Sequence, residues 1–257
     1  MNSATKALQV LRTIGIRSTL KALTGYRTRD DRLIQECLRG KAGLEVGGPS
    51  RFFRKIGLMP IYPVISSLDG VNFGTTTIWE GQLAAGRTYR WRDNGIGTQF
   101  IHDAVDLASL PDDAYDFVLS CNSLEHIANP IRALREWLRV TKPGGHLLLV
   151  LPNRHNNFDH RRPVTPFRHL LEDEANNIPE SDLTHLAEIL ELHDLSRDRR
   201  AGSPAEFRAR SEANFQNRCL HHHVFDVPLL REVMTHLRME VLASGAMKSD
   251  IYAFGRK

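Results

Sequence analysis

The stretch GLEVGGPS, residues 43–50, joins a short apolar run to a turn made of two glycines, a proline and a serine. Small residues let the backbone N–H groups of such a turn approach a ligand closely. Dinucleotides, nucleoside triphosphates and S-adenosylmethionine are all held on turns of this general kind. The stretch therefore predicts a strand followed by a ligand-binding turn, without choosing among these ligands.

Short apolar runs alternate with helical segments on either side of this turn, between residues 43 and 152. This alternation is typical of a parallel α/β sheet. We expect strands at 43–46, 64–68, 99–102, 117–120 and 146–151. The dipeptide Asn94-Gly95 predicts a tight turn and a small hairpin. Asn129 and Pro130 suit the cap and first position of a helix that ends before Gly144.

The alternation stops at residues 153–225, which are rich in His, Arg, Asn and Asp, and resumes after them. Ser203-Pro204-Ala205-Glu206 predicts a helix that begins with a capping box. We interpret 153–225 as a helical lid insertion within one domain that spans 43–257. Asp226 then caps a helix, followed by strands near 240–243 and 251–255.

The first 42 residues are predicted to form an N-terminal helical cap. Residues 4–24 have the pattern of a basic amphipathic helix, and residues 29–39 that of a second helix. Packing of the first helix on the domain is our interpretation, and weak contact with a membrane surface is the alternative.

Composition narrows the class of protein only slightly. The 41% hydrophobic and 25% charged residues are ordinary for a soluble globular protein of 257 residues. A net charge of +4 suits an anionic small molecule or a membrane surface as well as nucleic acid. The three cysteines are widely spaced, which fits a reducing cytoplasm, and the longest apolar run, 147–151, is too short to cross a bilayer. We therefore expect a cytoplasmic protein without a transmembrane segment.

Asp69 follows the second expected strand, 22 positions after Gly47. A carboxylate in that place can accept hydrogen bonds from both ribose hydroxyls of an adenine nucleoside, in NAD and in S-adenosylmethionine alike. The turn lacks the third glycine of GxGxxG, and this weakens the dinucleotide interpretation.

A resemblance to a known family covers residues 102–153, which read HDAVDLASLPDDAYDFVLSCNSLEHIANPIRALREWLRVTKPGGHLLLVLPN. The stretch resembles class I S-adenosylmethionine-dependent methyltransferases, in particular the subgroup that includes ubiquinone- and menaquinone-biosynthesis methyltransferases. The matching pieces are Asp103-Ala104, Tyr115-Asp116, Leu124-Glu125-His126, Leu134-Arg135-Glu136 and Lys142-Pro143-Gly144-Gly145. The resemblance implies a Rossmann-like α/β fold with a mostly parallel seven-stranded sheet, helices on both faces, and S-adenosylmethionine as the cofactor.

The resemblance also implies a cofactor-binding set. Its members are Glu45, Gly47 and Gly48 for the methionine part, Asp69 for the ribose, Asp103 and Ala104 for the adenine, and Ser120 beside the sulfonium. This chain has Pro49-Ser50 where the family turn usually has glycine or Thr-Gly, so the backbone donors of the turn stay open.

The methyl acceptor is predicted by exclusion. Methyltransferases of amino-adenine carry an Asn/Asp-Pro-Pro-aromatic loop after the fourth strand, whereas this chain has Cys121-Asn122-Ser123-Leu124. We therefore expect a small-molecule acceptor and no DNA. The polar lid favours a hydroxylated, anionic molecule, for example a sugar, a glycan end or a phenol. N-methyl transfer, and cofactor binding without turnover, are the alternatives.

Histidines are the candidate bases, because imidazole can take a proton from a hydroxyl near neutral pH. Eight of the 12 histidines lie between His155 and His223. His126 is the first candidate because it follows the fourth expected strand, close to the expected sulfonium. His160 and His223 are second candidates.

A metal site is the alternative to this metal-free chemistry. Its ligands would be Asp159, His160, His185 and the run 221–223, but no pair has a recognised ligand spacing. We therefore expect no metal.

Overall fold

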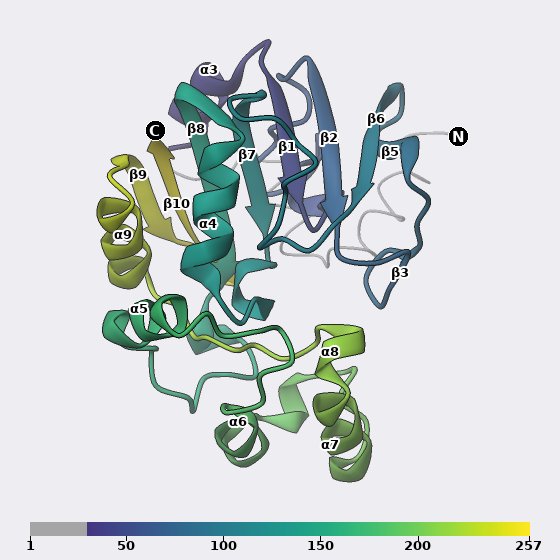
Figure 1. The fold of residues 1–257 in the computed structure, drawn as a ribbon, viewed down its shortest axis with the longest axis vertical. Coiled ribbons are helices and arrows are strands. Elements are labelled where there is room, and N and C mark those ends of the chain that lie inside the picture. Colours follow the sequence, from purple (N-terminus) through teal and green to yellow (C-terminus); the bar gives the residue numbers. More distant parts are fainter. Residues whose placement is uncertain (1–29) are drawn as a thin grey trace.

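The computed structural model describes residues 30–257, so the helix expected over 4–24 lies outside the described residues. Its centre is an eight-stranded sheet in the order β5-β6-β2-β1-β7-β8-β10-β9 (Figure 1). The strands are β1 Ala42–Val46, β2 Ser67–Asn72, β5 Gly86–Arg92, β6 Gly95–Ile101, β7 Tyr115–Cys121, β8 Thr141–Pro152, β9 Glu240–Ala246 and β10 Asp250–Arg256. The five central strands, from β6 to β8, run parallel, and the outer strands pair antiparallel with their neighbours.

The expected count of seven strands is wrong by one. The additional strand is β5, which turns back through Asp93-Asn94 and pairs antiparallel with β6 at the sheet edge. The predicted hairpin is therefore present, but its turn lies one residue before the predicted Asn94-Gly95, because Gly95 already pairs with Arg92. Two short strands, β3 Thr76–Thr77 and β4 Gly81–Gln82, form a separate small hairpin before it.

The expected position of the second strand is also wrong. Residues 61–64 form a turn in which Val64 N donates to Ile61 O at 3.0 Å, and pairing with β1 begins only at Ser67, opposite Ala42. Strand β2 therefore ends at Asn72. Asp69 is its third residue and does not follow it.

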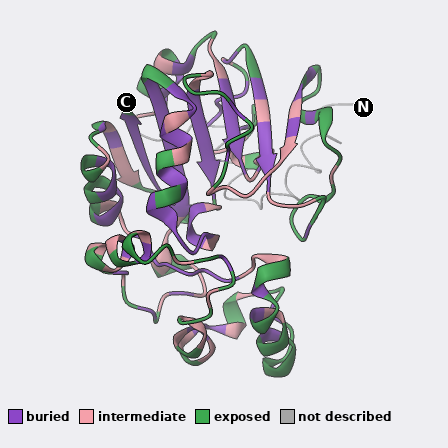
Figure 2. Ribbon diagram, viewed as in Figure 1, coloured by how far each residue is buried: buried purple, intermediate pink, exposed green. Residues whose placement is uncertain are grey.

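Helices cover both faces of the sheet, as expected. Alternate residues of each central strand point to opposite faces. On one face, Leu147 and Leu149 belong to the same core cluster as residues of α4 (Pro130–Arg139) and α9 (Val227–His236). On the other, Leu148 and Val150 share a cluster with α3 (Asp31–Leu38) and with residues 53–65. Figure 2 shows the central strands as largely buried.

The helix starts predicted from capping residues are confirmed. Asn129 accepts a hydrogen bond from Arg132 N at 3.1 Å, and Asp226 accepts one from Leu229 N at 2.8 Å. Ser203 and Glu206 form the reciprocal capping box. These bonds satisfy backbone N–H groups that have no partner inside the helix.

Residues 153–226, here called the lid segment, connect β8 to α9 and lie beyond the carboxyl ends of the parallel strands (Figure 1). The segment contains α5 Phe167–Ala175, α6 Leu186–Leu192, α7 Pro204–Glu212 and α8 Asn214–Asn217. It has a small apolar cluster of its own, made of Ile189, Ala201, Phe207 and Leu220. The division into a cap at 1–42 and a domain at 43–257 stays a prediction. Among the described residues, no helix has the length and apolar character needed to cross a membrane.

Candidate active site

The glycine turn follows β1 directly, at the carboxyl edge of the sheet. Gly47 has a φ of +82°, and a Cβ atom there would lie 2.0 Å from Ser123 Oγ. Gly47 N donates to Val71 O at 2.8 Å, which ties the turn to β2. Only glycine fits this position, because any side chain would be both strained and in collision.

Glu45 and Gly48 lie behind the turn and do not line the cavity beside it. The fully buried Glu45 carboxylate accepts hydrogen bonds from Tyr62 Oη and Tyr89 Oη, both at 2.6 Å, and from Ser50 N at 3.0 Å. Burial raises the pKa of Glu45 to about 7, although the donated bonds oppose this shift. Glu45 therefore stabilises the turn through its bond to Ser50 N and does not contact the cavity.

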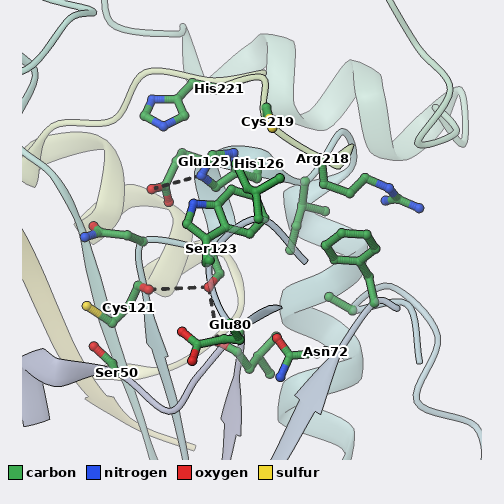
Figure 3. A pocket seen from close by; sticks show the side chains of 18 of the residues that line it. Ser50, Asn72, Glu80, Cys121, Ser123, Glu125, His126, Arg218, Cys219 and His221 are labelled. Carbon is green, nitrogen blue, oxygen red and sulfur yellow. Dashed lines mark hydrogen bonds and ion pairs between the residues drawn. The ribbon is translucent and has the colours of Figure 1, made fainter. Parts of the chain in front are cut away.

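A cavity of about 660 Å³ opens in front of the turn, between the carboxyl ends of the strands and the lid segment (Figure 3). This volume suits a small-molecule ligand together with a cofactor. Of the sequence-predicted residues, the structure brings together Gly47, Asp103, Ala104 and His126 on the cavity wall. It does not place Glu45, Gly48, Asp69, Ser120, His160 or His223 there.

Asn72 occupies the strand end that the sequence interpretation assigns to Asp69. The Asp69 carboxylate accepts hydrogen bonds from Thr98 N at 2.7 Å and Tyr115 Oη at 3.1 Å, away from the cavity. Asn72 lines the cavity, and its Nδ2 donates to Gly48 O at 3.0 Å. Strand β2 ends four residues later than expected, so Asn72 lies at the cavity in the place predicted for Asp69.

Arg218 connects the lid segment to the sheet edge. It donates to Asp103 Oδ2 at 2.9 Å and lies 2.6 Å from Glu180 Oε2. Its side chain is only 12% exposed. Asp103 is thus an ion-pair partner as well as a cavity residue.

His126 ends the short 3-10 helix η2, Leu124–His126, and projects into the cavity (Figure 3). Its Nδ1 lies 3.0 Å from Leu220 O in the lid segment. Because a carbonyl oxygen can only accept, Nδ1 carries the proton and Nε2 keeps a lone pair. The ring packs 5.0 Å from that of Trp79, and burial lowers the pKa of His126 to about 3. The imidazole is therefore neutral at physiological pH.

His221 is a cavity residue that the sequence interpretation did not single out as a base. Its Nδ1 lies 2.5 Å from Asp159 Oδ2, and its ring meets that of His126 edge-on at 4.6 Å. Burial alone would lower the pKa of His221, but the Asp159 carboxylate outweighs burial and raises it. Both oxygens of the adjacent Glu125 carboxylate are buried without a hydrogen-bond partner among the described residues. Ligand atoms of Glu125, His126 and His221 lie within 4.8 Å of one another, so this trio could also hold a metal ion.

Five arginines line the cavity, although it also contains acidic side chains. Arg218 pairs with Asp103, and Arg210 with Asp198 at 2.8 Å. The other three are Arg51, Arg54 and Arg200, which make no ion pair with any residue from 30 to 257. They supply positive charge that a bound anion can use.

His160 and His223 lie inside the lid segment, away from the cavity wall. His160 Nε2 is 2.8 Å from Asp194 Oδ2, and His223 Nε2 is 2.9 Å from Asp173 Oδ2. Asp194 and Asp173 are far from these histidines in the sequence, so the residues next to each histidine did not indicate its partner.

The sheet order, the glycine turn and the cavity at the carboxyl strand ends define a Rossmann-like α/β fold of the class I methyltransferase type. Residues 69–149 match the family model described as "Methyltransferase domain". A demethylmenaquinone methyltransferase from Clavibacter sepedonicus is 38% identical over 71 residues, which make up 27% of this chain and 28% of that protein. Residues 69–149 are thus similar to a methyltransferase domain, and the fold is that of class I S-adenosylmethionine-dependent methyltransferases, whose cofactor is S-adenosylmethionine.

A solved structure shares this fold. An S-adenosylmethionine-dependent methyltransferase from Mesorhizobium loti superposes with a TM-score of 0.52 at 14% identity, over 88% of this chain and 95% of that one. A SAM-dependent methyltransferase from Aquifex aeolicus gives a TM-score of 0.48 at 13% identity, over 100% and 99% of the two chains.

Proposed function

We propose that this chain transfers the methyl group of S-adenosylmethionine to a hydroxyl group of a small anionic acceptor, with His126 as the general base. The observation that carries this proposal is the position of the His126 imidazole. It lines the cavity with Nδ1 held by Leu220 O, and Nε2 lies 3.9 Å from Glu125 Oε1, beyond hydrogen-bond distance, so the lone pair of Nε2 is not used by that carboxylate. A sugar or glycan end fits this acceptor class.

The cofactor end of the cavity is proposed to be the glycine turn. Gly47 would leave room for the methionine part, Asn72 would meet the ribose, and Asp103 with Ala104 would border the adenine. The support is that all four line one cavity, beyond the ends of successive strands. Ligands of open α/β sheets bind at this edge.

The chemistry requires one bond to form and one to break. The acceptor oxygen attacks the methyl carbon as the C–S bond breaks, and S-adenosylhomocysteine leaves with the sulfur lone pair. The hydroxyl proton becomes strongly acidic as the new C–O bond forms, so even an imidazole with a pKa of about 3 can take it. His160 and His223 have no part in this proposal, because both lie away from the cavity wall.

Asn72→Ala is expected to weaken S-adenosylmethionine binding by about 1–3 kcal/mol, because it removes a partner of the ribose and a support of the turn. Asp69→Ala is the matched comparison. Its carboxylate bonds away from the cavity, so the variant should lose stability and keep its cofactor affinity. Titration calorimetry on both variants tests this, and the reverse ranking would restore Asp69 to the cofactor site.

Arg200→Ala is expected to raise the KM for an anionic acceptor by roughly 10-fold, since one exposed charge-assisted contact contributes about 1–2 kcal/mol. Arg199→Ala, one residue away, exposed and outside the cavity, is the control. Equal KM values for the two variants would remove Arg200 from the acceptor site.

A panel of sugars, phenols, amines and RNA, assayed by transfer of a labelled methyl group, tests the acceptor class. Transfer to hydroxyl groups is the expected result. Transfer to amines alone would favour N-methylation, and cofactor binding without any transfer would favour a binding protein.

The proposed location is the cytoplasm. All three cysteines are free, which supports a reducing compartment of this kind.

Metal-assisted transfer is a second candidate, favoured by the buried Glu125 carboxylate, which has two imidazoles beside it and no hydrogen-bond partner within residues 30–257. A cation there would bind the acceptor oxygen and lower its pKa. Removal of metal by a chelator would then stop transfer, whereas the histidine-base route would continue.

A further inference from the structure

A second cluster of histidines lies in the lid segment, outside the cavity. His169 and Asp173 are one turn apart on α5, His185 immediately precedes α6, and His223 lies on the return to α9. Ligand nitrogens of the three histidines lie within 4.8 Å of one another. The three histidines, from three separate pieces of chain, therefore meet at one point, and Asp173 contacts two of them.

The distances within this cluster suit one shared cation. His169 Nε2 is 3.0 Å from His185 Nε2 and 3.6 Å from Asp173 Oδ2, and His223 Nε2 is 2.9 Å from Asp173 Oδ2. Ligands at about 2.0–2.1 Å from a tetrahedral zinc ion are separated by roughly 3.3 Å. The observed separations bracket that value.

One nitrogen of the His223 ring lacks a partner within the cluster. Nδ1 of His223 is buried without a hydrogen-bond partner among the described residues. His223 therefore has one ring nitrogen in contact with Asp173 and one without a hydrogen-bond partner.

We propose that His169, Asp173, His185 and His223 bind one zinc-type divalent cation in tetrahedral geometry. Three imidazoles and one carboxylate form a donor set that zinc accepts, whereas magnesium and calcium prefer oxygen ligands. Four protein ligands leave no open position, so the site is structural and independent of the proposed methyl transfer. The sequence alone did not favour a metal, because its ligands are spread over 55 residues without a recognised spacing.

Such a site would fix the lid segment against the cavity. It ties α5 and the start of α6 to His223, three residues after Leu220, whose carbonyl holds His126. Asp173 O also accepts a hydrogen bond from Asn129 Nδ2 at 3.0 Å, at the start of α4. The cation would thus hold α5, α6 and the residues around His223 together, and through Asp173 it would hold them against the start of α4.

The test uses the full chain without a histidine tag. Elemental analysis of wild-type protein should give one zinc per chain, and Co²⁺ replacement should give the visible absorption of tetrahedral cobalt. His169→Ala and His185→Ala should each lose the tetrahedral spectrum and weaken zinc binding by more than the roughly 10–100-fold that a supporting residue costs. Both ligands are less buried than His223, so these variants are the ones best able to fold.

Two controls separate this site from other histidines. His155→Ala removes an exposed histidine of the same segment, and His126→Ala removes one from the cavity trio; both should keep the cobalt spectrum. A chelator should lower the Tm of wild-type protein and not that of His185→Ala. Wild-type protein that binds no zinc, a cobalt spectrum without tetrahedral bands, or unchanged zinc affinity in both ligand variants would each overturn the proposal.

Discussion

His126→Ala should lower the turnover number by about 10²–10⁴-fold, the usual effect of removing a general base. In the structure this imidazole is neutral, lines the cavity, is held at Nδ1 by Leu220 O at 3.0 Å and has Nε2 3.9 Å from Glu125 Oε1. Alanine leaves no nitrogen within reach of the acceptor hydroxyl. The loss should fall on turnover, because the glycine turn and Asn72 are untouched.

Single-turnover transfer of a labelled methyl group measures this effect, once the panel has identified an acceptor. S-adenosylmethionine affinity, measured by calorimetry, should stay within a few-fold of wild type. His155→Ala, an exposed histidine of the lid segment, should transfer at the wild-type rate. A His126→Ala enzyme that is equally fast would show that the proton leaves by another route.

Gly47→Ala should reduce S-adenosylmethionine affinity by about 100-fold or more. The new Cβ would lie 2.0 Å from Ser123 Oγ, so the turn or η2 must move. The φ of +82° adds roughly 1–2 kcal/mol of backbone strain for any residue with a Cβ. Both effects act at the edge of the cavity where the cofactor is proposed to lie.

Gly144→Ala is the matched control, because Gly144 has a φ of +72° and a Cβ atom added there would meet no other atom within 4 Å. It carries similar strain without the collision and lies outside the cavity, so only stability should fall. The double variant Gly47→Ala/Ser123→Ala removes the hydroxyl and should recover part of the affinity. If Gly47→Ala binds the cofactor as wild type does, the turn is not part of the cofactor site.

Local signals predicted much of this fold. Asn129, Asp226 and the Ser203–Glu206 pair each cap a helix through bonds within three residues, and the hairpin between Arg92 and Gly95 turns through two residues. Contacts this short depend on neighbouring residues only. They can therefore be inferred without knowing the rest of the structure.

The position of β2 could not be inferred in this way. The apolar residues at 64 and 65 resemble the start of a strand, yet pairing with β1 begins at Ser67. Register depends on the partner strand, and β2 ends at Asn72, four residues after the expected end at Leu68. The available signal was a second apolar residue beyond Asp69: Leu68 and Val71 pack on opposite faces of the sheet, as residues of one buried strand do.

The candidate site was predicted where residues follow a strand closely, and missed where the lid segment contributes. Gly47, Asp103 and His126 fall on the cavity wall. His221 and Arg218 reach it from about 100 residues further along the chain, through contacts with Asp159 and Asp103. Nothing in the spacing of a histidine-rich segment tells which ring meets which carboxylate.

The bond between His126 and Leu220 has a consequence for how this enzyme could diverge. The oxygen that selects the imidazole tautomer belongs to the main chain, so every amino acid at position 220 provides it. Side chains around the acceptor can therefore change during evolution without altering which nitrogen receives the proton. An insertion, a deletion or a displacement of the backbone near residue 220 would move this carbonyl and change the tautomer of His126. The number of residues in this part of the lid segment therefore has to be kept during evolution, whereas their identity is free to change.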